Sequence, residues 1–195
     1  MGNYEYGRIG VLARELARAE VAPELVEQIM EGGESIGKAA SPERKAAWMS
    51  EAMRRMDQLL DFGTRQAVRE GCACCLGGKR LEISKAIAKQ HETLEDRISA
   101  ANEAKLVFGH SVTVTPDGKV LVCFSPEGES QYRCVCLPKA KEAVSITYCY
   151  CCGGHVKHHL QIALGRKLDC TVHSSALSSA GRRPCTFLFG IQEQA

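Results

Sequence analysis

The sequence predicts an α+β fold, in which a helical N-terminal half packs on a mostly antiparallel sheet with one crossover helix. Apolar residues recur at helical spacing through the first half of the chain, and this periodicity changes after Gly109. Val112 and Val114 then alternate with threonines, and the turn-forming residues 116–118 connect this stretch to residues 120–124 as in a β-hairpin. Helices followed by strands are typical of the α+β class.

Composition and charge exclude several classes of protein. The chain has 195 residues, of which 45% are hydrophobic and 25% charged, enough to form a core without crosslinks. A net charge of +2 gives no reason to expect nucleic acid or an anionic membrane as a partner. The apolar runs are shorter than the roughly 18 residues of a membrane span, and the first residues do not resemble a secretory signal. We therefore expect a cytoplasmic protein.

Helical spacing, capping residues and glycine stops predict the elements of the first half. The expected helices are 7–19, 23–31, 41–63, a shorter one from Thr64, 80–89 and 92–104. In the second half we expect a helix at 155–164 and, besides the hairpin, strands at 131–136, 145–151, 167–174 and 185–191. Together these form a sheet of five or six strands. The domain organisation predicted is a helical region, 1–104, and a cysteine-rich α/β region, 105–195, in one compact unit.

The eleven cysteines are the main functional signal. An odd number of cysteines without a secretory signal argues against a disulfide framework and favours metal or thiol chemistry. Three cysteines lie in the first half of the chain, at positions 72, 74 and 75, and the other eight follow position 120. We expect Cys123, Cys170 and Cys185 to be core residues, because free cysteine packs like a small hydrophobe.

The spacing of the remaining cysteines predicts a metal site. Cys72 to Cys75 and Cys149 to Cys152 are C-x-x-C pairs, which let two thiolates reach one tetrahedral ion. On the predicted strands, Cys134 shares a face with Cys136, and Cys149 shares a face with Cys151. His155 follows directly. Zinc is the expected metal, with about four ligands drawn from Cys72, Cys75, Cys134, Cys136, Cys149, Cys151 and His155.

Two alternatives use the same residues. Cys151 or Cys152, placed at the start of a helix, is positioned as the thiolate of a thiol-dependent hydrolase or redox enzyme. An iron–sulfur cluster would also accept four thiolates. A zinc protease of the H-E-x-x-H type is excluded, because Val156 occupies the position of the general base.

From Cys134 onward the chain resembles bacterial and archaeal cysteine-rich proteins related to the 4-vinyl reductase domain and to the L-2-amino-thiazoline-4-carboxylic acid hydrolase-like group. The residues that carry the resemblance are Cys134-x-Cys136, Tyr148-Cys149-Tyr150-Cys151 with Gly154, Leu164-Gly165, Ser174-Ser175 and the ending Gly181 to Cys185 and Phe187. The resemblance implies an α/β small-molecule-binding fold, often a sensory module, with cysteines that hold a metal.

The leading prediction is therefore a cytoplasmic zinc-binding protein whose metal joins the helical and sheet halves. A small apolar or thiol-reactive molecule is the expected ligand beside that metal.

Overall fold

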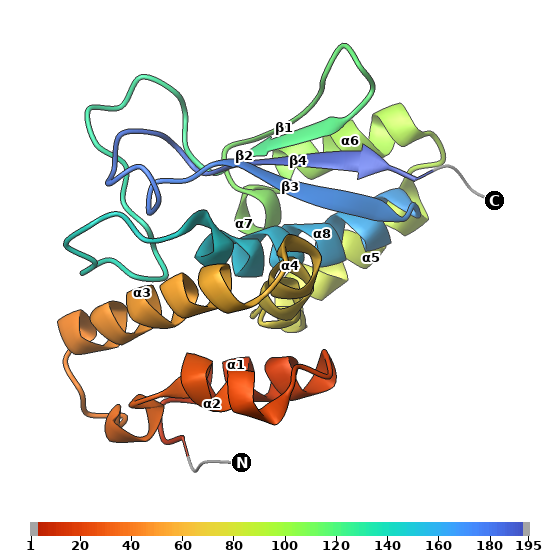
Figure 1. Cartoon of the computed structure of the whole chain (residues 1–195). Coiled ribbons are helices and arrows are strands. Elements are labelled where there is room, and N and C mark those ends of the chain that lie inside the picture. The colour runs from red at the N-terminus through yellow and green to blue at the C-terminus, as the bar shows by residue number, and fades with distance from the viewer. Residues whose placement is uncertain (1–3, 193–195) are drawn as a thin grey trace.

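The structure is a computed structural model that describes residues 4–192, and it confirms the α+β fold. Within these residues the chain forms eight α-helices and a four-stranded sheet (Figure 1). The helices are α1 (Gly7–Arg18), α2 (Pro23–Met30), α3 (Pro42–Leu59), α4 (Phe62–Gly71), α5 (Gly78–Gln90), α6 (Leu94–Glu103), α7 (Lys105–Phe108) and α8 (Tyr150–Leu164). The strands are β1 (Ser111–Val114), β2 (Val120–Cys123), β3 (Leu168–Ser174) and β4 (Thr186–Ile191). Short 3₁₀ helices, η1 and η2, cover Gly33–Ser35 and Ile146–Cys149.

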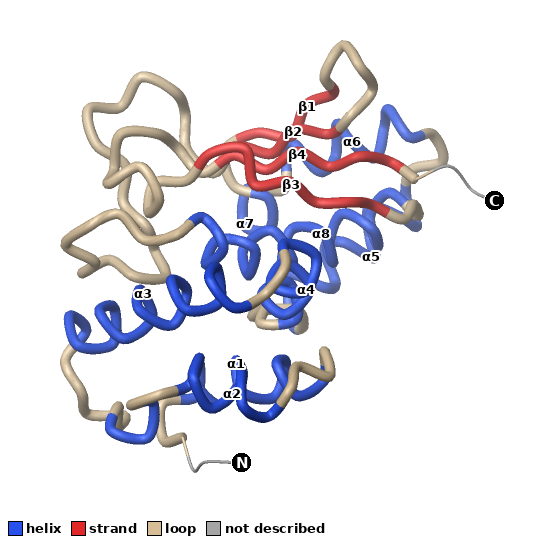
Figure 2. The backbone as a smooth tube through the Cα atoms, in the orientation of Figure 1, coloured by secondary structure: helices blue, strands red, loops and turns tan. Residues whose placement is uncertain are grey.

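The sheet has the strand order β1-β2-β4-β3, and every neighbouring pair is antiparallel (Figure 2). Its register aligns Phe187 with both Val122 and Val172. Because successive residues of a strand point to opposite faces, these side chains line one buried face. Asp169, on the other face, is exposed.

Helix α8 packs on the buried face of the sheet, with α4 and α5 on its other side (Figure 1). Gly153 and Gly154 permit this approach. A Cβ on Gly153 would lie 2.7 Å from Cys170 Sγ, and one on Gly154 would lie 2.5 Å from the backbone oxygen of Glu70. Two consecutive glycines therefore bring the start of α8 against both β3 and the end of α4.

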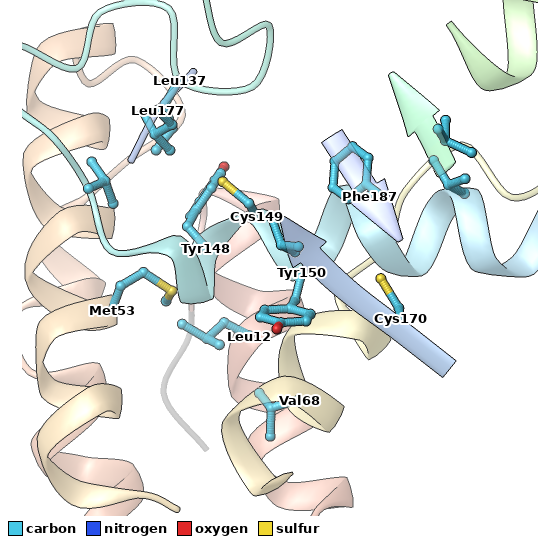
Figure 3. Close-up of a cluster of buried hydrophobic side chains, with 14 of the residues drawn as sticks. Leu12, Met53, Val68, Leu137, Tyr148, Cys149, Tyr150, Cys170, Leu177 and Phe187 are labelled. Atoms are coloured by element: carbon cyan, nitrogen blue, oxygen red, sulfur yellow. The ribbon is translucent and has the colours of Figure 1, made fainter. Parts of the chain in front are cut away.

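The N-terminal helices continue this core below α8. Figure 3 shows Leu12 of α1, Met53 of α3 and Val68 of α4 in one buried cluster with Tyr148 and Tyr150. Two caps define where α3 and α4 begin. The Ser41 side chain accepts a hydrogen bond from the Arg44 backbone N–H, and the Asp61 side chain accepts one from Thr64. No helix in the described part of the chain is long and apolar enough to cross a membrane.

Two predicted strands are wrong, and the sheet of the described residues has four strands rather than five or six. Residues 131–136 form a loop, while residues 146–149 form η2 and α8 already begins at Tyr150. The sequence Tyr148-Cys149-Tyr150 suggests strand alternation, yet all three residues are buried. Consecutive burial is incompatible with a half-exposed strand. Ser145 also starts the helical segment, because its hydroxyl accepts a hydrogen bond from Thr147 N–H at 3.1 Å.

The predicted helix boundaries need two further corrections. The helix expected at 155–164 begins five residues earlier, since the two glycines lie inside α8 and mediate its packing. The helix expected at 41–63 ends at Leu59, because Asp61 caps α4 from Phe62 onward.

Candidate thiol site

Four cysteines form a cluster at the start of α8. The Sγ atoms of Cys136 and Cys152 lie 3.8 Å apart. The Cys136 thiol also hydrogen-bonds with the thiols of Cys134 and Cys151. Cys151 and Cys152 belong to the first turn of α8, and the other two lie in the loop between β2 and η2. We call Cys134, Cys136, Cys151 and Cys152 the thiol cluster.

Backbone groups favour negative charge on this cluster. The positive end of the α8 dipole lies at this cluster, where η2 runs directly into the helix and the Tyr150 N–H donates to the backbone oxygen of Thr147. In the loop, the Cys134 Sγ accepts a hydrogen bond from the backbone N–H of Leu137 at 3.4 Å. Thiolate sulfur is the better acceptor for such donors.

Two arginines lie beside the thiol cluster. Arg69 is only 3% exposed, and its Nη2 donates to the backbone oxygen of Tyr148 at 3.0 Å. Arg8, at the exposed start of α1, donates to the backbone oxygen of Cys136 and, at 3.4 Å, to the Tyr148 hydroxyl. Among residues 4–192 neither guanidinium forms a salt bridge with Asp or Glu. The thiol that can serve as the anionic partner of Arg69 is therefore that of Cys151.

The environment shifts the thiol pKa values apart. Hydrogen bonds from the Cys136 and Cys152 thiols hold the pKa of Cys151 well below its usual range against the effect of burial, with help from both arginines. A hydrogen bond from Cys136 lowers the pKa of Cys134 to about 6. The pKa of Cys136, which donates to these neighbours, is raised. Within the cluster, the environment thus favours ionisation of Cys134 and Cys151 over that of Cys136.

The thiol cluster opens into a pocket of about 390 Å³, which we call the cysteine pocket. Apolar residues from α7, from the end of β2 and from the loop at 133–136 form one wall. The residues that line the pocket are Cys74, Cys75, Arg80, Lys105, Leu106, Val107, Gly109, Phe124, Ser125, Arg133, Cys134, Val135, Cys136, Cys151, Cys152, His155, Ala176 and Cys185. Seven of these are cysteines, and none is Asp or Glu.

The structure brings most of the predicted site residues near one another. Cys134, Cys136 and Cys151 belong to the thiol cluster. Cys72, at the end of α4, lies near Arg69 and Cys151, and burial raises its pKa to about 11. Cys75 and His155 line the pocket.

Cys149 does not lie with the other predicted ligands. It is buried, its thiol donates to the Ser175 hydroxyl at 3.0 Å, and burial raises its pKa to about 12. Its predicted place beside Cys151 depended on a strand, and in η2 and α8 the two side chains do not share a face. Cys149 is therefore a core residue in this structure.

Two histidines of α8 hold the loop that carries the first cysteines. The His155 Nδ1–H donates to the backbone oxygen of Cys74 at 2.9 Å, and the His159 Nε2–H donates to that of Cys75 at 3.1 Å. Burial lowers the pKa of both imidazoles. Cys75 has a φ of +61°, a backbone conformation that non-glycine residues seldom adopt. The histidines thus fix a strained loop at the edge of the pocket.

Sequence reasoning gave no role to Arg69 or Tyr148. It considered Cys152 as the second member of a C-x-x-C pair and as a nucleophile, but left it out of the expected ligand set. One signal was available for Arg69. It precedes Cys72 by three residues, a spacing that places both side chains on the same face of a helix. Tyr148 offered no such signal, because its contact with Arg69 joins segments 79 positions apart.

No group of three or more His, Cys, Asp and Glu side chains between residues 4 and 192 is arranged as a ready-made metal site. Zinc and an iron–sulfur cluster therefore stay predictions.

Fold and site define an α+β protein with a cysteine-lined pocket at the start of a buried helix. The chain belongs to a family of unknown function, DUF6144, whose model matches residues 12–187. No curated protein and no solved structure matches the chain significantly. The resemblance to the 4-vinyl reductase domain and the hydrolase-like group is not addressed by these comparisons and stays a prediction.

Proposed function

We propose that this protein holds a zinc ion through the thiol cluster and binds or senses a small molecule in the adjoining cysteine pocket. The observation that carries the proposal is the grouping of four thiols beside two arginines without carboxylate partners among the described residues. Three of these thiols, Cys134, Cys136 and Cys151, belong to the ligand set expected from the sequence, and Cys152 takes the place of Cys149.

Charge balance supports a metal–thiolate centre. Burying a guanidinium without a counter-charge costs several kcal/mol, so the position of Arg69 requires an anion nearby. A zinc ion with four thiolates carries a net charge of two minus. The guanidiniums of Arg69 and Arg8 would balance it, whereas four neutral thiols leave Arg69 uncompensated.

Sulfur spacing is compatible with zinc. A tetrahedron with Zn–S bonds of about 2.3 Å has S···S edges of about 3.8 Å. The distance from Cys136 Sγ to Cys152 Sγ is 3.8 Å. The thiols of Cys134 and Cys151 interact with Cys136, and both side chains would have to rotate to complete the set, because no three such side chains among the described residues are already arranged for a metal.

Thiolate ligands also bear on where the protein works. All eleven cysteines are unpaired in the structure. A site of this kind needs reduced thiols, and the cytoplasm maintains them. A cytoplasmic protein is therefore part of the proposal.

Metal analysis of protein purified anaerobically without chelator tests the proposal. We expect one zinc per chain in the wild type, and most of it lost in Cys136→Ser and Cys152→Ser. Cys149→Ser is the matched control, because this neighbouring thiol is buried outside the cluster. Zinc retention by Cys152→Ser and loss by Cys149→Ser would contradict the proposed ligand set. If the protein instead contains iron and sulfide and absorbs visible light, the cofactor on these thiols is an iron–sulfur cluster and not zinc.

A second candidate is a thiol-dependent hydrolase or redox enzyme, favoured by the position of Cys151. Its thiol lies in the first turn of α8, beside Arg69, and lines the cysteine pocket. These features are typical of a reactive thiolate. In metal-free protein, this candidate predicts that one thiol is alkylated much faster than the others at neutral pH and that Cys151→Ala removes the fast phase. Uniformly slow alkylation of all cysteines would exclude it.

A further inference from the structure

Three cations line the cysteine pocket. They are Arg80 in the first turn of α5, Lys105 at the start of α7 and Arg133 in the loop before the thiol cluster. We call them the basic rim. The N-terminal end of α5 adds a positive partial charge beside Arg80. No acidic residue lines the pocket, so its electrostatic field is positive on this side.

The charges of the basic rim are not neutralised by carboxylates of residues 4–192, since none of the three forms a salt bridge there. The Arg80 Nε donates to the backbone oxygen of Leu106 at 3.2 Å, and the Lys105 Nζ donates to that of His110 at 2.6 Å. Carbonyl oxygens orient these side chains without cancelling their charge. Both cations are thus held in place and retain their full attraction for an anion.

An apolar wall lies next to the basic rim. Leu106 is 48% exposed and Val135 is 83% exposed, two of the few large hydrophobic side chains that face solvent in the described chain. Phe124 and Val107 extend the same wall into the pocket. Exposed apolar side chains that border a pocket are typical of ligand contact surfaces.

We propose that the cysteine pocket binds an amphipathic organic anion, with its acidic group on the basic rim and its apolar part on Leu106, Phe124 and Val135. The volume of about 390 Å³ is that of a small-molecule site. The inference names the ligand class for the proposed function and rests on its small-molecule part, while it does not require zinc.

Three probes that differ only in charge test this inference. They are 4-phenylbutyrate, 4-phenyl-1-butanol and 4-phenylbutylamine, titrated into the full chain by calorimetry, with backbone amide NMR shifts to locate binding. We expect the acid to bind more tightly than the alcohol and the alcohol more tightly than the amine. Added salt should weaken the binding of the acid only, because salt screens the attraction between exposed opposite charges.

Charge removal on the basic rim provides the decisive variants. Lys105→Gln and Arg133→Gln should each lower the affinity for the acid about two- to fivefold and leave the affinity for the alcohol unchanged. Val135→Ser should lower the affinity for all three probes, because it removes part of the apolar wall. Arg166→Gln is the control, since Arg166 is an exposed cation at the other end of α8, and it should change nothing.

The inference is overturned if the acid and the alcohol bind with equal affinity or if the acid does not bind. It is also overturned if the rim variants bind the acid as tightly as Arg166→Gln does. Its failure is distinguishable from failure of the proposed function, because the rim variants leave the thiol cluster intact. Protein that holds zinc but does not prefer the acid contradicts only the ligand class. Protein that prefers the acid but holds no metal contradicts only the zinc proposal.

Discussion

The guanidinium of Arg69 lies over the ring of Tyr148, 4.7 Å from its centroid, and donates to the backbone oxygen of the same residue at 3.0 Å. This double contact joins α4 to η2 immediately before the thiol cluster. It also fixes a buried cation whose Nε has no hydrogen-bond partner in the described structure. A buried donor without an acceptor is costly. The arrangement therefore favours an anion at the thiol of Cys151.

Replacement of Arg69 tests how far this cation activates the thiols. In metal-free protein, Arg69→Met should raise the pKa of Cys151 and therefore slow its alkylation at every pH below the new pKa. Arg69→Lys should retain much of the wild-type rate, because it keeps the charge. The measurement is the rate of iodoacetamide labelling of Cys151, followed by mass spectrometry.

Arg65→Met is the matched control for this prediction. Arg65 lies one turn earlier on α4, and its Nε is 3.4 Å from Asp57 Oδ1. Its removal should leave the alkylation rate of Cys151 unchanged. Equal slowing in both variants would show that helix integrity, and not the Arg69 charge, controls the thiol.

Gly154 determines how closely α8 approaches α4. A methyl group in Gly154→Ala would lie 2.5 Å from the Glu70 backbone oxygen and 2.8 Å from its Cα. Backbone atoms cannot yield as a side chain can, so we expect a loss of about 1–3 kcal/mol in the free energy of unfolding. Urea denaturation measures it. Gly77→Ala is the control, since no atom lies within 4 Å of its new methyl group, and a similar loss there would refute the packing explanation.

The first half of the fold was predictable because local signals agree with the tertiary structure. Ser41-Pro42 marks the start of α3 as expected, and the apolar stripe that includes Met49, Met53 and Met56 is buried. The hairpin of β1 and β2 also follows from alternation and a turn. Such elements depend on neighbours close in sequence.

The start of α8 was mispredicted because distant contacts decide its structure. Tyr148-Cys149-Tyr150-Cys151 alternates like a strand, but Gly154 packs on Glu70, more than eighty positions away in the chain. That contact requires a helix through both glycines. The same change of element moves Cys149 into the core and brings Cys152 into the thiol cluster. Cysteine density thus predicted the location of the site, while the individual members depended on the local backbone.

Cys134 should titrate near pH 6. The hydrogen bond from Cys136 lowers its pKa to about 6 from the ordinary value of 9.0. In metal-free protein the iodoacetamide reactivity of Cys134 should therefore reach half its maximum near that pH, and Cys136→Ala, which removes the donor, should move the midpoint upward. The contrasting thiol is Cys170, whose pKa burial raises to about 12. Identical pH profiles for the two cysteines would contradict the role of the Cys136 donor.

The sign of the linked stability change follows from the direction of this shift. A thiol whose pKa is lowered on folding stabilises the protein fully above its unfolded pKa. This stabilisation is lost as the pH falls from about 9 toward about 6. The free energy of unfolding of metal-free wild type should decrease over that interval, and Cys134→Ser should reduce the decrease. An unaltered slope in the variant would mean that other groups carry the pH dependence.

Buried His159 makes a second pH-dependent contribution through Ser84. The His159 Nε2–H donates to the Cys75 oxygen, and Nδ1 lies 3.0 Å from the Ser84 hydroxyl, which is also 3.0 Å from the Arg80 backbone oxygen. Burial lowers the pKa of His159 below its ordinary 6.5 and so favours the neutral imidazole, in which Nδ1 accepts from Ser84. A histidine whose pKa is lowered on folding stabilises the protein above the unfolded value, and this stabilisation is lost as the pH falls below about 6.5.

His159→Gln should therefore lower the free energy of unfolding by about 1–3 kcal/mol at neutral pH, through the loss of two buried hydrogen bonds. The difference from wild type should shrink as the pH falls through the normal range of histidine titration, because acid removes the same stabilisation from the wild type. His173→Gln serves as the control, since His173 is exposed on β3, and it should have little effect at any pH. Denaturation at several pH values measures all three proteins. A pH-independent difference for His159→Gln would show that the imidazole acts by shape alone and not as a neutral hydrogen-bonding group that holds the Cys75 loop.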